Sequence, residues 1–168
     1  KGIILSGGPS TVVNSPQKKI PKILINAKIP ILGICYGLQL LAITFGGKVI
    51  TKKTLREFGK AEVKKKNNSL LTRNFFDDNA SSVWMSHQDA VSHIPRNFNL
   101  VGSTKNSKFT IIENKNKKYY GVQFHPEVTH TKKGKILLKN FIYLICNLKK
   151  KWRISSQKNV LINKIKNI

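Results

Sequence analysis

The sequence predicts an α/β fold built on an open, mostly parallel sheet flanked by helices. Two short apolar runs typical of buried strands, residues 2–5 and 29–34, are separated by a helical pattern at residues 16–27, and another helical pattern follows directly. Alternation of strands and helices along a chain favours parallel strands that are joined by helices. The 168 residues are enough for one domain with its own hydrophobic core.

The second helix is expected to begin near Gly37. Its apolar side chains recur at i, i+3, i+4 and i+7, which places them on one helix face: Leu38, Leu41, Ala42 and Phe45. Gly46 and Gly47 can supply the C-terminal cap, because glycine readily adopts the left-handed conformation that ends many helices. Cys35 therefore falls at the turn between the strand at residues 29–34 and this helix.

The middle of the sequence, residues 48–122, is richer in strands and predicts a smaller strand-rich portion of the fold. Six segments have the composition of short strands: residues 48–50, 61–65, 82–87, 99–104, 109–114 and 119–124. A long helix, apolar on one side, is expected at residues 133–148. We expect one domain over residues 1–150 and a basic linker at residues 151–168.

The chain is strongly basic, with 31 Lys and Arg against seven Asp and Glu and a formal net charge of +24. Such a charge would ordinarily indicate nucleic-acid binding, because phosphate contacts release counterions. Here the lysines form scattered clusters mixed with Asn and Ile, and these three residue types share A/T-rich codons. Compositional bias accounts for the charge, so we expect a solvated basic surface and no nucleic-acid partner.

Other composition features exclude further classes of protein. Two cysteines, Cys35 and Cys146, are too few for a disulfide framework and predict a reducing cytoplasmic location, with Cys146 as a core residue. The longest apolar runs, residues 29–41 and 136–145, are interrupted before the ~20 residues that a membrane span requires, so no membrane partner is expected. No metal-site spacing relates the four histidines: His87, His93, His125 and His130.

Cys35 is the strongest candidate for a nucleophile. Gly33 and Gly37 flank it at two residues on each side, and a nucleophile on a sharp strand-to-helix turn needs such small neighbours. The N–H groups at the start of the following helix favour a thiolate and can bind an oxyanion. The alternative is a buried structural cysteine, which is the usual role of a free cysteine.

A thiolate nucleophile needs a proton partner, and His125 follows the predicted strand at residues 119–124. The carboxyl ends of parallel strands lie at one edge of a sheet, so His125 and Cys35 are expected to share that edge. Glu127 is close enough along the chain to orient the imidazole as the third member of a triad. The alternative is a surface histidine beside a proline, since this short pattern is not specific by itself.

Two stretches, GICYGLQLLA at residues 33–42 and GVQFHPEV at 121–128, resemble the class I, triad-type glutamine amidotransferases. Three further stretches narrow the resemblance to the glutaminase domains of the GMP synthetase family: GIILSGGPS, REFGKAEV and VWMSHQDAV. The resemblance extends over residues 1–153 and implies a flavodoxin-like open α/β sheet. It also implies that a first strand and helix of the domain precede residue 1 in relatives.

The resemblance implies a catalytic role for three residues. Cys35 would attack the side-chain amide of glutamine and form a γ-glutamyl thioester. His125 would protonate the departing ammonia and then activate the water that cleaves the thioester, and Glu127 would hold His125.

The resemblance also implies how substrate is bound. Backbone N–H groups of Gly8 and Tyr36 would bind the oxyanion, and Gln39, Ser86 and His87 would recognise glutamine. For two of these residues a purely structural interpretation stays open: Gln39 as an exposed helix residue, and His87 as a polar side chain with its hydrogen bonds satisfied.

The implied partners lie outside this domain. No cofactor is expected within it, whereas ATP and Mg²⁺ would be used by an ATP-pyrophosphatase synthetase domain that aminates XMP to GMP, and a homodimer would form through that domain. Residues 151–168 resemble the linker that leads into it. The alternatives are a glutaminase subunit of the anthranilate synthase or CTP synthetase type, or an inactive fragment that acts as a basic binding module.

Overall fold

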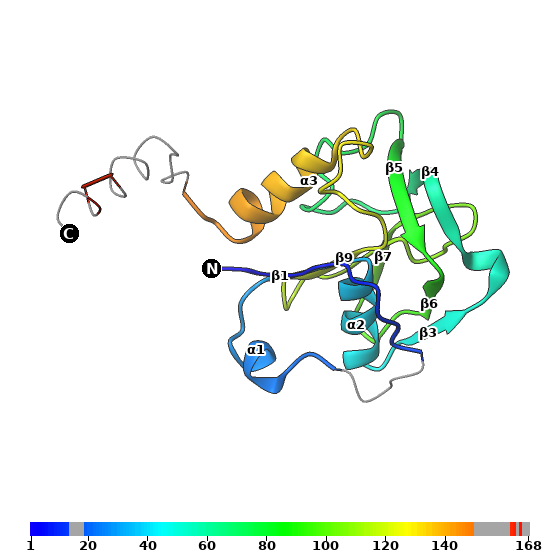
Figure 1. The fold of residues 1–168 in the computed structure, drawn as a ribbon, viewed down its shortest axis with the longest axis horizontal. Helices are drawn as coiled ribbons and strands as arrows, with labels where there is room; N and C mark the ends of the chain where they lie inside the picture. The colour runs from blue at the N-terminus through cyan, green and yellow to red at the C-terminus, as the bar shows by residue number, and fades with distance from the viewer. Residues whose placement is uncertain (14–18, 150–161, 164, 166–168) are drawn as a thin grey trace.

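The computed structural model describes residues 1–13, 19–149, 162, 163 and 165. Its main feature is a seven-stranded sheet with the strand order β1-β2-β9-β8-β7-β4-β5, and a smaller sheet pairs β3 with β6 (Figure 1). The strands are β1 (Ile3–Leu5), β2 (Ile31–Ile34), β3 (Lys48–Thr51), β4 (Glu57–Lys65), β5 (Ala80–His87), β6 (Asp89–His93), β7 (Asn99–Ser103), β8 (Ile111–Asn114) and β9 (Tyr119–Val122).

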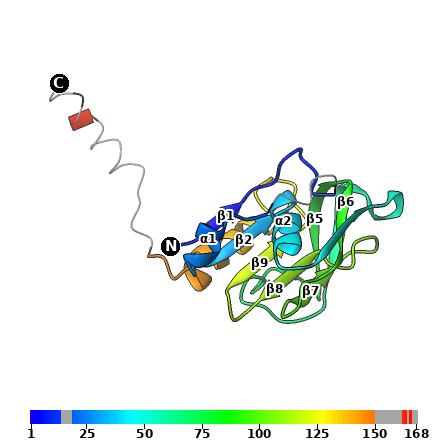
Figure 2. The same ribbon diagram turned by 90° about the horizontal axis from the view of Figure 1, so that it is seen from below.

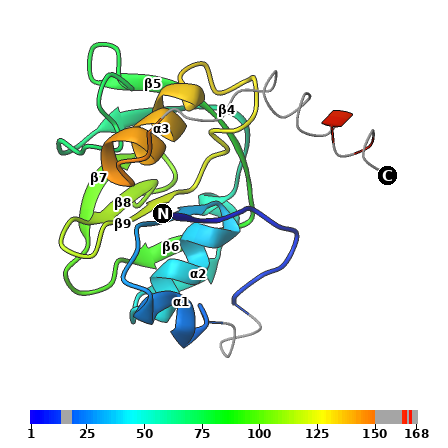
Figure 3. The same ribbon diagram turned by 90° about the vertical axis from the view of Figure 1, so that its left-hand side faces the viewer.

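Helices cover both faces of the large sheet. The helix α2 (Tyr36–Thr44) and the short α1 (Lys22–Asn26) lie on one face, and α3 (Gly134–Lys139) with the π-type segment η2 (Asn140–Ile145) lies on the other (Figures 1 and 3). A short 3₁₀ turn, η1 (Lys53–Leu55), connects β3 to β4. Figure 2 shows α1 and α2 lying over the β1 and β2 end of the sheet.

Each face of the sheet has its own hydrophobic core. Under α3, the side chain of Leu137 packs with Leu32 and Phe124, and all three are fully buried. Under α2, Leu38 and Leu41 pack with strand residues such as Ile31. The predicted apolar face of the second helix is confirmed, because its residues are buried or pack against this second core.

The predicted α/β class is confirmed, but the sheet is mixed rather than mostly parallel. Parallel pairing is confined to the β1, β2 and β9 strands, and the pairs from β9 through β8, β7 and β4 to β5 are antiparallel. The reason is the connections: parallel neighbours need a crossover, usually a helix, and no helix separates β4 from β5, β7 from β8 or β8 from β9. Most strands of the predicted strand-rich middle portion therefore belong to the main sheet, whereas β3 and β6 form the small sheet.

Two predicted helices differ in their bounds. The helix expected at residues 16–27 comprises only Lys22–Asn26, with Pro21 at its N-cap, and residues 14–18 lie outside the described part of the chain. The helix expected at 133–148 continues from α3 into η2 and ends at Ile145, because Asn147 adopts a left-handed φ of 51° that a helix cannot contain. The predicted linker, residues 151–168, lies almost entirely outside the described residues.

Candidate active site

Cys35 lies on a strained turn between β2 and α2. Its φ of 51° is in the left-handed region, which a non-glycine residue rarely adopts. A side chain at Gly33 would lie 2.5 Å from the carbonyl carbon of Gly37, and a side chain at Gly37 would overlap the carbonyl oxygen of Leu5. The two glycines allow the close backbone approach that this turn requires, as their spacing predicted.

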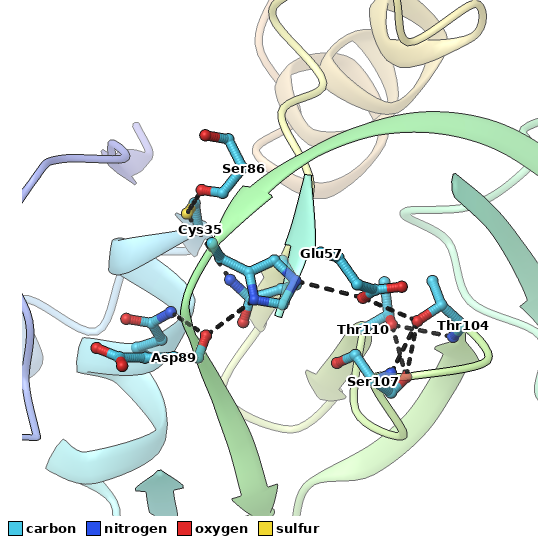
Figure 4. A network of polar contacts seen from close by, with 10 residues as sticks. Cys35, Glu57, Ser86, Asp89, Thr104, Ser107 and Thr110 are labelled. Atoms are coloured by element: carbon cyan, nitrogen blue, oxygen red, sulfur yellow. Dashed lines mark hydrogen bonds and ion pairs between the residues drawn. The ribbon is translucent and has the colours of Figure 1, made fainter. Parts of the chain in front are cut away.

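The sulfur of Cys35 is buried among polar groups. Its Sγ lies 3.7 Å from the backbone oxygen of Ser86, which can accept from the thiol (Figure 4), and 3.7 Å from Nε2 of Gln123, which can donate to the sulfur. The residue is only 6% exposed. Its backbone N–H donates to the carbonyl oxygen of Val122 at 2.8 Å, and this hydrogen bond connects the turn to the end of β9.

His125 lies between Cys35 and Glu127. Its Nδ1 is 2.7 Å from Oε1 of Glu127. The backbone of Gly7 lies against both His125 and Cys35, because a Cβ added to Gly7 would be 2.9 Å from Cε1 of His125 and 3.6 Å from Cβ of Cys35. The neighbouring Cys35 side chain is the largest cause that raises the pKa of His125 to about 9, and Glu127 adds to it, whereas partial burial lowers the pKa. Cys35 and Glu127 thus both favour the protonated form of the imidazole.

The backbone of His125 is held by two neighbours. Its N–H donates to the carbonyl oxygen of Trp84 at 3.1 Å, and its carbonyl oxygen accepts from the hydroxyl of Thr131 at 2.6 Å. The same hydroxyl accepts from the N–H of Trp84 at 3.1 Å. Buried Thr131 thus connects the His125 turn to β5.

A cavity of about 630 Å³ opens next to Cys35. It is lined by all the predicted site residues except Glu127: Gly8, Cys35, Tyr36, Gln39, Ser86, His87 and His125. Glu127 is an exposed residue that reaches the site through its contact with His125. The structure therefore brings the predicted residues together from the turn after β1, the start of α2, the end of β5 and the turn after β9.

Two of the lining residues make their hydrogen bonds inside the protein. Nε2 of Gln39 donates to the carbonyl oxygen of Asp89 at 2.8 Å, and Gln39 is 3% exposed. Nδ1 of His87 lies 3.1 Å from the same oxygen, and its Nε2 lies 3.3 Å from Oε2 of Glu57. Gln39 is therefore buried, and both ring nitrogens of His87 have partners.

The sequence interpretation missed two acidic residues, Asp89 in the lining of the cavity and Glu57 behind the lining residue His87. The carboxylate of Asp89 accepts hydrogen bonds from the hydroxyls of Thr11 and Thr51. Glu57 on β4 contacts His87 on the neighbouring strand β5 (Figure 4). A signal for Glu57 was present, because it lies six residues before the buried Val63 and so on the same face of β4. Asp89 offered no comparable signal, since its partners come from distant parts of the chain.

The described residues contain neither a metal-ligating cluster nor a membrane-spanning helix. Among them, no three His, Cys, Asp or Glu side chains are grouped so that they could hold a metal ion. None of the helices in the described part of the chain is both long and apolar enough to cross a bilayer.

Comparison with known proteins agrees with this geometry. The family profile described as "Glutamine amidotransferase class-I" matches residues 1–145. A GMP synthase (glutamine-hydrolyzing) of Wigglesworthia glossinidia brevipalpis is 45% identical over 99% of this chain and 33% of its own length. The GMP synthase (glutamine-hydrolyzing) of Clostridium tetani is 45% identical over 100% of this chain and 32% of its own length. The chain thus spans about a third of the length of the curated relatives that it matches.

Solved structures show the same likeness. A Thermoplasma acidophilum protein described as a GMP synthase subunit has a TM-score of 0.75 and 33% identity, over 87% of this chain and 72% of that one. A glutamine amidotransferase from Thermotoga maritima has a TM-score of 0.64 and 25% identity, over 87% of this chain and 66% of that one. Since the family profile covers most of the sequence, the chain belongs to the class I glutamine amidotransferase family.

Proposed function

We propose that this chain hydrolyses glutamine to glutamate and ammonia, with Cys35 as nucleophile, His125 as general acid and base, and Glu127 as the residue that orients His125. The observation that carries the proposal is the position of His125, which lines the same cavity as Cys35 and whose Nδ1 lies 2.7 Å from Glu127, beside a space large enough for an amino acid. A cysteine on a strained turn at a helix start is activated for attack by its base and by the helix N–H groups.

In the proposed reaction, Cys35 is a thiolate beside protonated His125, and its Sγ bonds to the amide carbon of the glutamine side chain. The amide C–N bond breaks, the leaving nitrogen takes a proton from His125, and ammonia departs to leave a γ-glutamyl thioester. Neutral His125 then takes a proton from water, whose oxygen attacks the thioester, and glutamate and the thiol are released. The raised pKa of His125 favours the protonated imidazole that this step requires.

The remaining cavity residues are proposed to bind the substrate. The N–H groups of Gly8 and Tyr36 would stabilise the oxyanion that forms at each tetrahedral step. Gln39 and the Ser86–His87 segment would recognise glutamine. Their place in the lining of the cavity that contains Cys35 supports these roles.

We further propose that the ammonia is used to aminate XMP to GMP. The names of the relatives support this step, and because the chain spans about a third of their length, the amination would need a synthetase domain that binds ATP and Mg²⁺. In this proposal residues 1–150 form the glutaminase domain, residues 151–168 lead toward the synthetase domain, and a homodimer would form through the latter.

Covalent labelling tests the glutaminase proposal without the synthetase domain. The purified chain is treated with a diazoketone analogue of glutamine, and its intact mass is measured. We expect one adduct in the wild type and in Cys146→Ala, and none in Cys35→Ala. Absence of an adduct on folded wild-type protein would overturn the proposal and favour an inactive binding module.

The amination proposal needs a separate assay. The chain is mixed with a GMP synthase from which the glutaminase domain has been removed, and glutamine-dependent formation of GMP from XMP and ATP is measured. Glutamine-dependent GMP formation that requires Cys35 would support it. Glutamine hydrolysis without GMP formation would favour an amidotransferase subunit of another type.

A further inference from the structure

Glu57 and His87 form a buried pair at the junction of the two sheets. They lie directly opposite each other in the antiparallel register of β4 and β5, and their side chains are 7% and 1% exposed. His87 is the last residue of β5 in the large sheet, and Asp89 begins β6 in the small sheet. The pair therefore lies where the chain passes from one sheet to the other, beside the cavity.

The hydrogen-bond chemistry places protons on this pair. The carbonyl oxygen of Asp89 can only accept, so Nδ1 of His87 carries the hydrogen in their 3.1 Å contact. The 3.3 Å contact between Nε2 and Oε2 of Glu57 then needs a second hydrogen, on the imidazole or on the carboxyl group. Without it, the lone pair of Nε2 would face a buried carboxylate.

Glu57 is itself held from the opposite side. Its Oε2 accepts from the hydroxyl of Thr104 at 3.0 Å, and that hydroxyl accepts from the N–H of Ser107 at 2.9 Å. A continuous chain of polar contacts thus extends from the turn after β7, through Glu57 and His87, to the backbone of Asp89 (Figure 4).

The backbone at the end of this chain borders the nucleophile. The oxygen of Asp89 accepts from both His87 and Gln39, and the oxygen of Ser86, one residue before His87, lies 3.7 Å from Sγ of Cys35. Both ring nitrogens of His87 are used within the protein, so the ring is better suited to hold this segment than to contact substrate.

We propose that Glu57 is a positioning residue of the glutamine cavity, which acts through His87 to fix the Ser86–Asp89 segment opposite Cys35. This inference rests on the proposed glutaminase function. In this proposal His87 shapes the cavity by holding the backbone of Asp89, which in turn accepts from Gln39. The backbone of the Ser86–Asp89 segment and the side chain of Gln39 are thereby fixed in the positions from which they bind the substrate.

Two labelling reagents test the proposal on the 168-residue chain. The diazoketone analogue of glutamine reports on the cavity, whereas iodoacetamide reports on the thiol alone. We expect Glu57→Leu to slow labelling by the analogue about tenfold, the equivalent of one lost hydrogen bond, and to leave the iodoacetamide rate within about twofold. Glu57→Gln should restore the analogue rate, because an NH2 group in the place of Oε2 can donate to Nε2 of His87 and to the hydroxyl of Thr104, whose own hydrogen can go to the carbonyl oxygen of Ser107.

The chain offers a matched control and a second variant. Glu62 lies on the same strand but is exposed, so Glu62→Leu should label like the wild type with both reagents. Thr104→Val removes the other partner of Glu57 without changing a charge, and we expect about threefold slower analogue labelling with unchanged iodoacetamide labelling. If Glu57→Leu does not fold, this variant decides the question.

Several results would overturn the proposal. The first is that Glu57→Leu reacts with the analogue at the wild-type rate, or is slowed equally with both reagents. The second is that Glu57→Gln does not restore the rate of analogue labelling. The third, if Glu57→Leu does not fold, is that Thr104→Val reacts with the analogue at the wild-type rate. An NMR spectrum in which Nδ1 of His87 carries no proton would also overturn it. By contrast, a wild-type chain that reacts at Cys35 with iodoacetamide but not with the analogue would instead refute the proposed function.

Discussion

Nδ1 of His125 lies 2.7 Å from Oε1 of Glu127, and only Pro126 separates the two residues. This contact is made within one turn, whereas the partner on the other side of the imidazole, Cys35, comes from a different strand end. One half of the candidate triad is therefore local in sequence, and the other half depends on how β2 and β9 pair. The two halves can be perturbed separately.

The titration of His125 should show which half dominates. Its pKa is raised from an ordinary value of 6.5 to about 9, with the Cys35 side chain as the largest cause. We expect an imidazole titration midpoint near 9 by NMR, a large fall in Cys35→Ala and a smaller fall in Glu127→Gln. A wild-type midpoint near 6.5 would contradict this expectation.

The same pKa shift makes stability depend on pH. Because folding raises the pKa of His125, its protonation stabilises the fold fully below about pH 6.5, and the contribution is lost as the pH rises through about 9. We therefore expect the difference in unfolding free energy between the wild type and His125→Gln to shrink over this range. Urea unfolding at several pH values measures it, and a difference that grows with pH would refute the assignment.

Substitution of Gly37 by alanine should disrupt the Cys35 turn. A Cβ at this position would overlap the carbonyl oxygen of Leu5, so the β1 strand and α2 would have to move apart. We expect a loss of about 3 kcal/mol or more in unfolding free energy, in the range of severe backbone clashes. Gly8→Ala is the control, because nothing lies within 4 Å of its Cβ position, and equal stability of the two variants would contradict the prediction.

Removal of the Thr131 hydroxyl should loosen the His125 turn. Thr131→Val deletes a donor to the His125 carbonyl and an acceptor for the Trp84 N–H, and the site is buried. We expect a loss of about 1–3 kcal/mol in unfolding free energy, since two partly buried backbone groups each lose a partner, together with slower labelling of Cys35 by the glutamine analogue. Thr131→Ser keeps the hydroxyl and should restore both, whereas a Ser variant as impaired as Val would show that only the methyl group matters.

The two phenylalanines at positions 124 and 58 should differ sharply in their contribution to stability. Phe124 is fully buried and stacks on Phe75 with ring centroids 5.6 Å apart, whereas Phe58 lines the cavity and is 64% exposed. We expect Phe124→Ala to cost about 3–5 kcal/mol and Phe58→Ala less than about 0.5 kcal/mol, measured by chemical denaturation. Similar losses in both variants would contradict the burial that the structure shows.

Local features of the fold were predictable from the sequence because they depend on short-range periodicity. The apolar face of α2 was one such feature, and so was the glycine pair that ends the helix, since Gly46 adopts a φ of 90°. Helix ends were less predictable, because they depended on single residues such as Asn147, whose left-handed conformation is not encoded by an apolar pattern.

The order of residues along the chain was enough to identify the candidates for chemistry: Cys35 between its two glycines, and His125 with Glu127 just after a strand. It was enough because turn geometry and strand ends depend on neighbouring residues. The tertiary structure was needed to show that the sheet is mixed and that Glu57 faces His87. Strand pairing and its register bring together residues that are distant in the chain, and the composition of a strand does not specify its neighbour.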